Sequence, residues 1–204
     1  MKIKSIRKLK LSVAFLVMGG LIVASCGGNS DTASTLPVEE IVETTIPETT
    51  TTTTIPVVVN PLTGAPAADE SILNRPALIV KIDNHPKARP QWGLNQADLV
   101  FEENVEQLTR FAAVFHSQGS DPVGPIRSGR LQDIDLLGSL NHPLLAWSGG
   151  NQKVTSAIRK SWLVDLSHSV ANEKGGYRRE SSRSAPHNLV AETTKLWSLA
   201  PADA

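Results

Sequence analysis

The chain has 204 residues, in which 20 lysines and arginines balance 20 aspartates and glutamates, and it contains one cysteine. This length accommodates one domain with some additional sequence, and the zero net charge argues against an electrostatic nucleic-acid partner. A single cysteine excludes an internal disulfide framework and a cysteine-rich zinc site.

The first 25 residues have the pattern of a secretory signal. Residues 1–10 carry five basic side chains and no acidic one, and the 14 uncharged, mostly apolar residues Leu11–Ala24 follow. Such a run is shorter than the about 20 residues of a membrane-spanning helix but typical of a signal-peptide core. It ends in Val23-Ala24-Ser25-Cys26, which resembles a bacterial lipobox. The resemblance implies a diacylglycerol on Cys26, which anchors the chain to the extracytoplasmic face of the cell membrane. An unlipidated secretory signal and an uncleaved anchor are the alternatives.

Residues 27–58 form an acidic linker with ten threonines, three prolines and neither basic nor aromatic residues. This composition predicts a disordered stalk, because so few apolar side chains cannot offset the entropy of ordering. Removing the signal leaves 15 basic against 20 acidic residues, a net charge of −5. All five excess acids lie in the linker, so the remaining sequence is neutral. The threonines also allow O-glycosylation, although an unmodified spacer explains them equally well.

Residues 59–204 contain strand and helix patterns in alternation, which predicts an α/β domain with a mixed sheet and flanking helices. The segment 76–83 reads as a buried strand, 93–97 as a turn or short helical piece, and 99–105 with 109–116 as an antiparallel pair. Next come a helix over 131–140, a strand over 144–147, a helix over 152–162, a strand over 163–166, a polar loop over 167–184, and a last helix over 186–199. No strong closing element precedes Ala204, so we expect the domain to be incomplete at this end.

The sequence lacks several familiar catalytic motifs. It has no G-x-S-x-G elbow, no S-x-x-K pair, no phosphate-binding Walker loop and no H-E-x-x-H zinc motif. Its five histidines show no metal-ligand spacing. We therefore expect neither a metal nor a cofactor.

Two polar groups accompany the predicted strands. The polar turn 85–91 follows the first strand, where ligands bind in open α/β sheets; an ordinary surface loop is the alternative. On the strand pair, Glu103 shares a face with apolar residues, a costly position unless the carboxylate is paired. The turn length decides whether Arg110 reaches Glu103 or Glu102. A structural ion pair and an up-shifted general acid both fit Glu103.

Two further groups precede predicted helices. Arg127 and Arg130 flank small residues where a loop enters a helix, a pattern that favours an anion pocket. A surface pair bound to Asp133 or Asp135 is the alternative. His187 lies at the predicted start of the last helix, where its neutral form is favoured. This position suits proton transfer, and it equally suits a histidine that anchors a loop.

The motifs together resemble the YerB-like bacterial lipoproteins, whose main domain has no assigned function. The matching stretches run in order from about residue 60 to 189: PLTG at 61–64, IDNH at 82–85, ARPQ at 88–91, EE at 102–103, TRF at 109–111, GPIRS at 124–128 and APHN at 185–188. The resemblance implies an exported lipoprotein with an α/β domain, followed in family members by a further C-terminal domain. One departure is Gln107-Leu108, where the family has a turn containing Gly-Gly.

From these residues we predict a lipoprotein that binds an anionic component of the cell envelope. The candidate ligand-binding residues are Asn84, His85, Arg89, Gln91, Arg110, Arg127, Ser128, Arg130 and Asn188. The first alternative is an envelope hydrolase or phosphotransferase, with Asp83, Glu103 and His187 as candidate catalytic residues and arginines that stabilise developing negative charge. The second is a stalked scaffold that presents a protein-binding surface. The oligomeric state is left open.

Overall fold

The structure, a computed structural model, describes residues 56–204. The predicted signal peptide, the lipid attachment at Cys26 and nearly all of the predicted linker lie outside these residues. No helix in the described part of the chain has the length and apolar character needed to cross a membrane.

The core of the fold is a five-stranded mixed sheet with the strand order β2-β3-β1-β4-β5. β1 lies at its centre, antiparallel to β3 and parallel to β4, while β2 extends β3 and β5 extends β4. The strands are β1 (Leu78–Asp83), β2 (Leu99–Val105), β3 (Leu108–Phe115), β4 (Leu144–Ala146) and β5 (Val164–Asp165). The predicted α/β class with a mixed sheet is confirmed.

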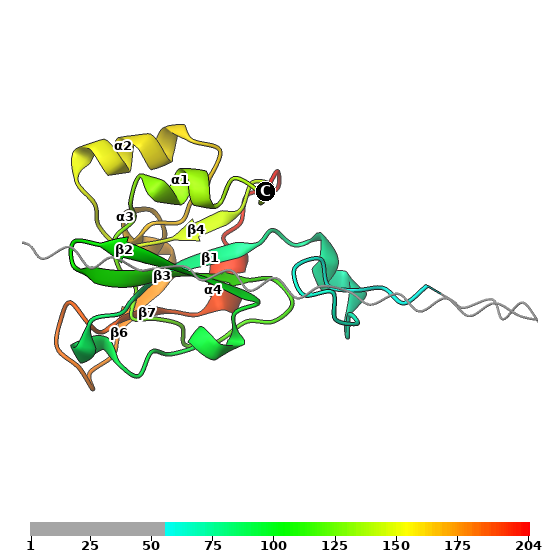
Figure 1. Cartoon of the computed structure of the whole chain (residues 1–204), viewed down its shortest axis with the longest axis horizontal. Coiled ribbons are helices and arrows are strands. Elements are labelled where there is room, and N and C mark those ends of the chain that lie inside the picture. The colour runs from blue at the N-terminus through cyan, green and yellow to red at the C-terminus, as the bar shows by residue number, and fades with distance from the viewer. Residues whose placement is uncertain (1–55) are drawn as a thin grey trace, which may run out of the picture. The chain divides into compact units, whose positions relative to one another are not determined.

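Each face of the sheet is covered by its own layer (Figure 1). The helices α1 (Gln132–Leu136) and α2 (Gln152–Lys160) pack on one face, against the side chains of Ile79, Ala112 and Leu145. The other face carries α3 (His168–Ala171), α4 (Thr193–Trp197) and the small sheet of β6 (Tyr177–Arg179) and β7 (Leu189–Ala191). Alternate residues of β1 therefore enter two different cores, as the two-residue period of a strand requires.

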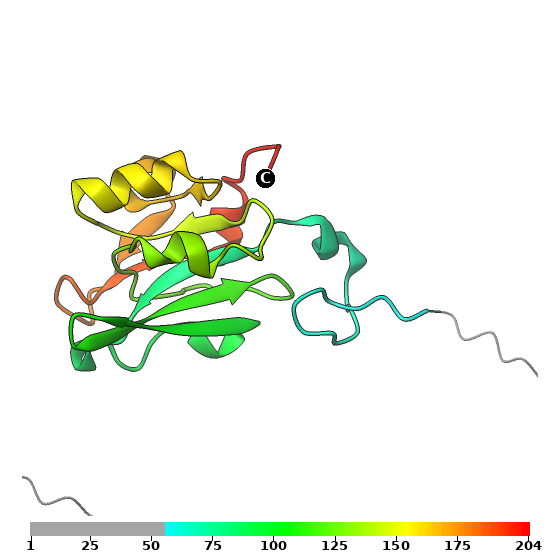
Figure 2. The ribbon, with the colours of Figure 1, turned by 45° about the horizontal axis from the view of Figure 1, so that its top comes forward.

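Short 3-10 helices connect these elements. They are η1 (Glu70–Asn74), η2 (Pro86–Ala88), η3 (Leu94–Gln96) and η4 (Asn172–Lys174). The segment that contains η1 meets the sheet at the amino end of β1, and Ala204 lies near that same end (Figure 2). The β2–β3 turn lies at the opposite end of the sheet, beside the carboxyl end of β1 (Figures 1 and 2).

The structure corrects two predicted elements. The last helix does not begin at Pro186: residues 189–191 form β7, and only residues 193–197 are helical. The predicted polar loop over 167–184 contains α3, η4 and β6. The two missed strands have one cause, since β7 pairs with β6, a partner that local periodicity does not reveal.

Candidate functional site

The segment 125–130, which contains Arg127 and Arg130, begins in the crevice between β1 and β4. Along the first half of β1, residues 78–80 pair with β4. Along the second half the chain of residues 125–127 takes this place, with Asp83 N–H donating to Pro125 O and Arg127 N–H donating to Lys81 O. On its other side, Ser148 N–H donates to Arg127 O. The two parallel strands diverge here at their carboxyl ends, the usual location of ligands in α/β sheets.

Asp83, the last residue of β1, is the centre of this end of the sheet. One of its carboxylate oxygens accepts a hydrogen bond from the backbone N–H of His85 at 3.0 Å. The other lies 2.7 Å from His187 Nδ1 and 3.3 Å from Arg127 Nε. The ring of His187 stacks on that of His85, with centroids 4.5 Å apart. The side chain of Asp83 is only 5% exposed, so a nearly buried carboxylate holds a histidine and an arginine that are distant in sequence.

Arg127 and Arg110 lie beside this carboxylate, and Arg130 lies close to Arg110. The β2–β3 turn has two residues, which places Arg110 opposite both Asp83 on β1 and Glu103 on β2. Burial lowers the pKa of Arg110, and the positive charges of Arg130 and Arg127 lower it further. We call Arg110, Arg127 and Arg130, together with Asp83, the arginine site.

The arginine site has unused binding capacity. Arg127 Nε is buried and makes no hydrogen bond within the described structure, because its approach to Asp83 is close but poorly aligned. The side chain as a whole is 27% exposed, so solvent reaches part of it. Arg130 has a distant partner in Glu106, at 3.7 Å, whose side chain is 86% exposed and therefore well solvated. A cavity of about 400 Å³ adjoins Arg130 and is lined also by Glu106, Ser128, Gly150, Asn151 and Val154.

Several of the predicted ligand-binding residues form hydrogen bonds with one another or with nearby loops. The Asn84 amide donates to Thr109 Oγ1 at 2.6 Å, and its oxygen accepts from Arg89 Nε at 3.0 Å and Gln91 Nε2 at 3.2 Å. Asn188 donates to the carbonyls of Glu180 and Arg183 and accepts from Arg179. These amides already have protein partners, whereas the three arginines retain positive charge in excess.

Glu103 belongs to a separate cluster. Its carboxylate pairs with Lys81 rather than with Arg110, and Lys81 also lies 2.6 Å from Asp133 on α1. Burial raises the pKa of Glu103, the charge of Lys81 opposes this rise, and Asp133 adds to it. Lys81 was not among the residues predicted from the sequence, although a lysine within the aliphatic run 78–82 indicates a buried partner.

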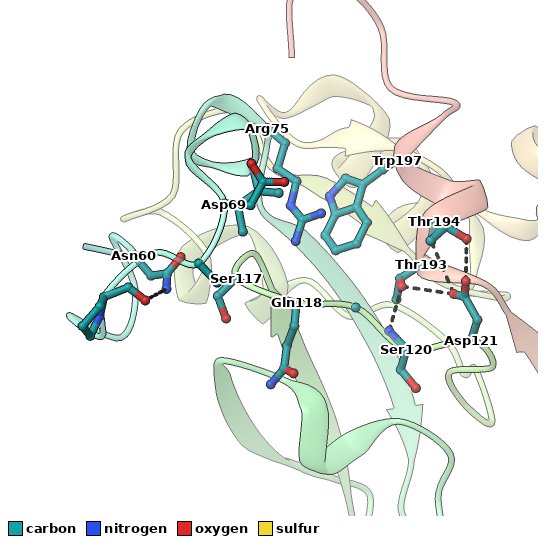
Figure 3. A pocket seen from close by; sticks show the side chains of 14 residues that line it. Asn60, Asp69, Arg75, Ser117, Gln118, Ser120, Asp121, Thr193, Thr194 and Trp197 are labelled. Carbon is teal, nitrogen blue, oxygen red and sulfur yellow. Dashed lines mark hydrogen bonds between the residues drawn. The ribbon is translucent and has the colours of Figure 1, made fainter. Parts of the chain in front are cut away.

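A larger cavity of about 610 Å³ lies at the other end of the sheet (Figure 3). The Arg75 guanidinium lies 3.7 Å from the ring centroid of Trp197, and the Asp121 carboxylate accepts hydrogen bonds from Thr193 and Thr194 (Figure 3). None of the candidate residues named from sequence lines this cavity. Its charged groups have protein partners, so we place the candidate site at the carboxyl end of β1. Among residues 56–204, no three His, Cys, Asp or Glu side chains are arranged to hold a metal ion.

The fold and the site define the class of this protein as a mixed α/β domain with charged loops at the end of its central strand. Comparison with known proteins then identifies the family. The chain belongs to the family described as protein of unknown function (DUF3048) N-terminal domain, which matches residues 62–204.

Two comparisons lead to YerB of Bacillus subtilis. In strain 168 this protein is named as a candidate lipoprotein, and it is 36% identical to the chain over 131 residues, which is 63% of the chain and 38% of YerB. The crystal structure of YerB superposes with a TM-score of 0.63 and 29% identity, and covers 69% of this chain and 48% of that one. In both comparisons the chain spans less than half of the length of YerB. The chain is therefore a homologue of a candidate lipoprotein of unknown function.

Proposed function

We propose that this protein is anchored by a lipid on Cys26 at the extracytoplasmic face of the cell membrane. In this position its domain binds an anionic component of the cell envelope through the arginine site. The ligand class is a phosphate- or carboxylate-bearing polymer or a lipid-linked precursor. The name of the YerB relative supports the lipid anchor. The observation that carries the binding proposal is the gathering of Arg127 and Arg130 near Arg110 at the carboxyl end of β1, where Asp83 lies beside Arg127 and opposite Arg110.

The charge balance of the site favours an anion. Burial depresses the pKa of Arg110, and the guanidinium groups of Arg130 and Arg127 lie close enough to depress it further. The acids near Arg110 are nearly buried Asp83 and solvated Glu106. Holding like charges together costs free energy, and a bound anion would remove this cost. Planar guanidinium groups also match the oxygen pairs of phosphate and carboxylate, with two parallel hydrogen bonds each.

The arginines are held in place before any ligand binds. Arg110 lies on a central strand and donates to Ser128 O at 3.4 Å, and the chain around Arg127 is bonded to β1 on one side and to residue 148 on the other. The backbone N–H of Arg130 donates to Asp133 at 2.7 Å. Little ordering is then required on binding, which increases affinity for a given set of contacts.

Calorimetric titration of the purified chain tests this proposal. The probes are inorganic pyrophosphate, a phosphorylated sugar, a lipid-pyrophosphate analogue and an anionic glycan. We expect at least one probe to bind, and Arg127→Ala to weaken it at least about tenfold, which corresponds to about 1.4 kcal/mol. The matched control is Arg159→Ala, an exposed arginine that pairs with Asp165 away from the site. Equal effects of the two variants, or no binding of any probe, would contradict the proposal.

A second candidate function, an envelope hydrolase or phosphotransferase, is favoured by the Asp83–His187 pair. Because His187 Nδ1 faces the carboxylate at 2.7 Å, the aspartate orients the ring and leaves Nε2 for proton transfer. The arginines would stabilise negative charge that develops on a transferred phosphoryl group.

Turnover assays separate this function from binding alone. If the protein is an enzyme, His187→Gln abolishes the release of phosphate from a bound probe while binding persists. If it is a binding module, no probe is turned over by the unchanged protein.

A further inference from the structure

Lys81, Glu103 and Asp133 form a buried cluster outside the arginine site. Lys81 and Asp133 have side chains that are 0% exposed, and that of Glu103 is 5% exposed. The lysine Nζ lies 2.6 Å from Asp133 Oδ1 and is also hydrogen-bonded to Glu103 Oε1. Three ionisable groups thus share a space from which water is almost excluded.

The fold brings these residues together from three elements. Lys81 on β1 is paired with Ala112 on β3, whose small side chain lets the lysine extend across the strand toward Glu103 on β2. Asp133 covers the cluster from the first turn of α1. Its other oxygen, Oδ2, accepts the backbone N–H of Arg130 at 2.7 Å, and Gln132 Nε2 donates to Glu103 Oε2 at 2.9 Å. Both carboxyl groups are therefore fixed in orientation.

We propose that Lys81 Nζ and Asp133 Cγ become joined by an intramolecular amide bond, with Glu103 as the acid and base. Glu103 accepts a proton from the lysine ammonium, and the neutral amine attacks Cγ of Asp133. The C–N bond forms, and Glu103 passes this proton and then a second one from the attacking nitrogen to one carboxyl oxygen of Asp133. The C–O bond to that oxygen then breaks. One water molecule leaves, and its oxygen comes from Asp133 and its hydrogens from the lysine amine.

The surroundings fit each role in this condensation. Amine and carboxyl group are held in contact, which removes the entropic cost of bringing them together. The Arg130 N–H points at the oxygen of Asp133 on which negative charge develops. Burial and the neighbouring Asp133 raise the pKa of Glu103, which suits a carboxyl group that must carry a proton. The product replaces a buried ion pair, which is costly to desolvate, by a neutral amide.

The bond would connect β1 to α1 across 52 residues of sequence. It would also fix the backbone of Arg130, because the N–H of this residue bonds to the same Asp133 side chain. The proposed amide thus supports the arginine site without forming part of it.

Peptide mass spectrometry of the full chain, denatured and digested with chymotrypsin, tests the proposal. We expect a branched peptide that joins the segment containing Lys81 to the segment containing Asp133, lighter by one water molecule than its two linear arms. Trypsin should also fail to cleave after Lys81. Recovery of Lys81 and Asp133 only in linear peptides would overturn the proposal, and so would a branch that joins Lys81 to Glu103.

Variants test the roles of the two acids. Asp133→Asn should yield the same branched peptide by release of ammonia, whereas Asp133→Ala should yield only linear peptides. Glu103→Gln should lose the branch, and the adjacent, exposed Glu102→Gln should keep it. A branch formed in Glu103→Gln at the yield of the unchanged chain would overturn the role of Glu103.

Discussion

The side chain of Asp83 connects three separate parts of the site. Its two carboxylate oxygens contact the backbone of the loop that begins at His85, the ring of His187 and the guanidinium of Arg127. The sequence indicated Asp83, His187 and Arg127 as separate candidates, each in its own motif. Their contact could not be predicted, because His187 lies 104 residues from Asp83. His187 is in the loop that connects β6 to β7, and the pairing of these two strands is not visible in the sequence pattern.

The position of Lys81 in the sequence indicated a buried partner, but Lys81 was not named as a candidate residue. A lysine between Val80 and Ile82 in a fully buried strand must have a partner, since an unpaired buried ammonium is too costly. The sequence predicted Glu103 as a buried acid, with Arg110 as its partner if the turn has two residues. The structure pairs Glu103 with Lys81 instead, and leaves Arg110 for the arginine site.

Tyr177 provides a prediction at the scale of one residue. It is the single tyrosine of the chain, its hydroxyl donates to Leu166 O, and burial raises its pKa from the usual 10.0. Because the folded state holds this proton more tightly, its contribution is complete below pH 10.0 and is lost as the pH rises above that value. We expect the free energy of unfolding to fall by up to about 1.4 kcal/mol per pH unit in that range.

Tyrosinate absorbance measures this directly, since it should appear with unfolding and not at pH 10 in the folded protein. Tyr177→Phe is the control. It should lose about 1 kcal/mol with the hydrogen bond and should abolish the part of the pH dependence that is due to Tyr177. A tyrosine that titrates normally in the folded protein would contradict the account.

At the scale of elements, the β2–β3 hairpin positions Arg110 of the arginine site. Its turn consists of Glu106 and Gln107, with φ angles of 50° and 71°. Two-residue turns of this kind favour asparagine and glycine, because other residues are strained at positive φ. The absence of that pattern left the register undetermined from sequence, and the register decides that Arg110 lies opposite Glu103 rather than Glu102.

Gln107→Gly should therefore stabilise the protein. Relief of the left-handed strain should raise the free energy of unfolding by about 1 kcal/mol, measured by urea denaturation. Gln118→Gly, at an exposed position without positive φ, should have no stabilising effect. A destabilising effect of Gln107→Gly would show that this turn is not strained.

At the scale of the whole molecule, composition and periodicity predicted the α/β class, the central strand and the antiparallel pair. The separation of the two cores on either side of the sheet was not predictable, because the pattern that predicts a helix such as α1 does not say which face of the sheet the helix covers. The contact between Arg75 and Trp197 was also beyond prediction, because it depends on the placement of α4 beside the amino end of β1.

That contact joins the segment before β1 to the last helix. The Arg75 guanidinium stacks on the ring of Trp197, and Trp197 Nε1 donates to Pro76 O at 3.0 Å. We expect Trp197→Ala to lower the free energy of unfolding by about 2 to 3 kcal/mol, since it removes the ring, the stacking and the hydrogen bond. Trp197→Phe keeps a ring beneath Arg75 and should lose about 1 kcal/mol. Equal losses in both variants would refute the role of the stacking.

We expect Arg110, Arg127 and Arg130 to form one anion site. Side-chain NMR of the arginine Nε–H groups during titration with inorganic pyrophosphate tests it most directly. We predict that the Nε–H signals of Arg110, Arg127 and Arg130 shift together and saturably, because pyrophosphate binds the guanidinium groups to which these N–H groups belong. The signals of Arg159 and Arg178, which already pair with acids elsewhere, should stay in place. Uniform small shifts of all arginines, or none at saturating pyrophosphate, would contradict the claim.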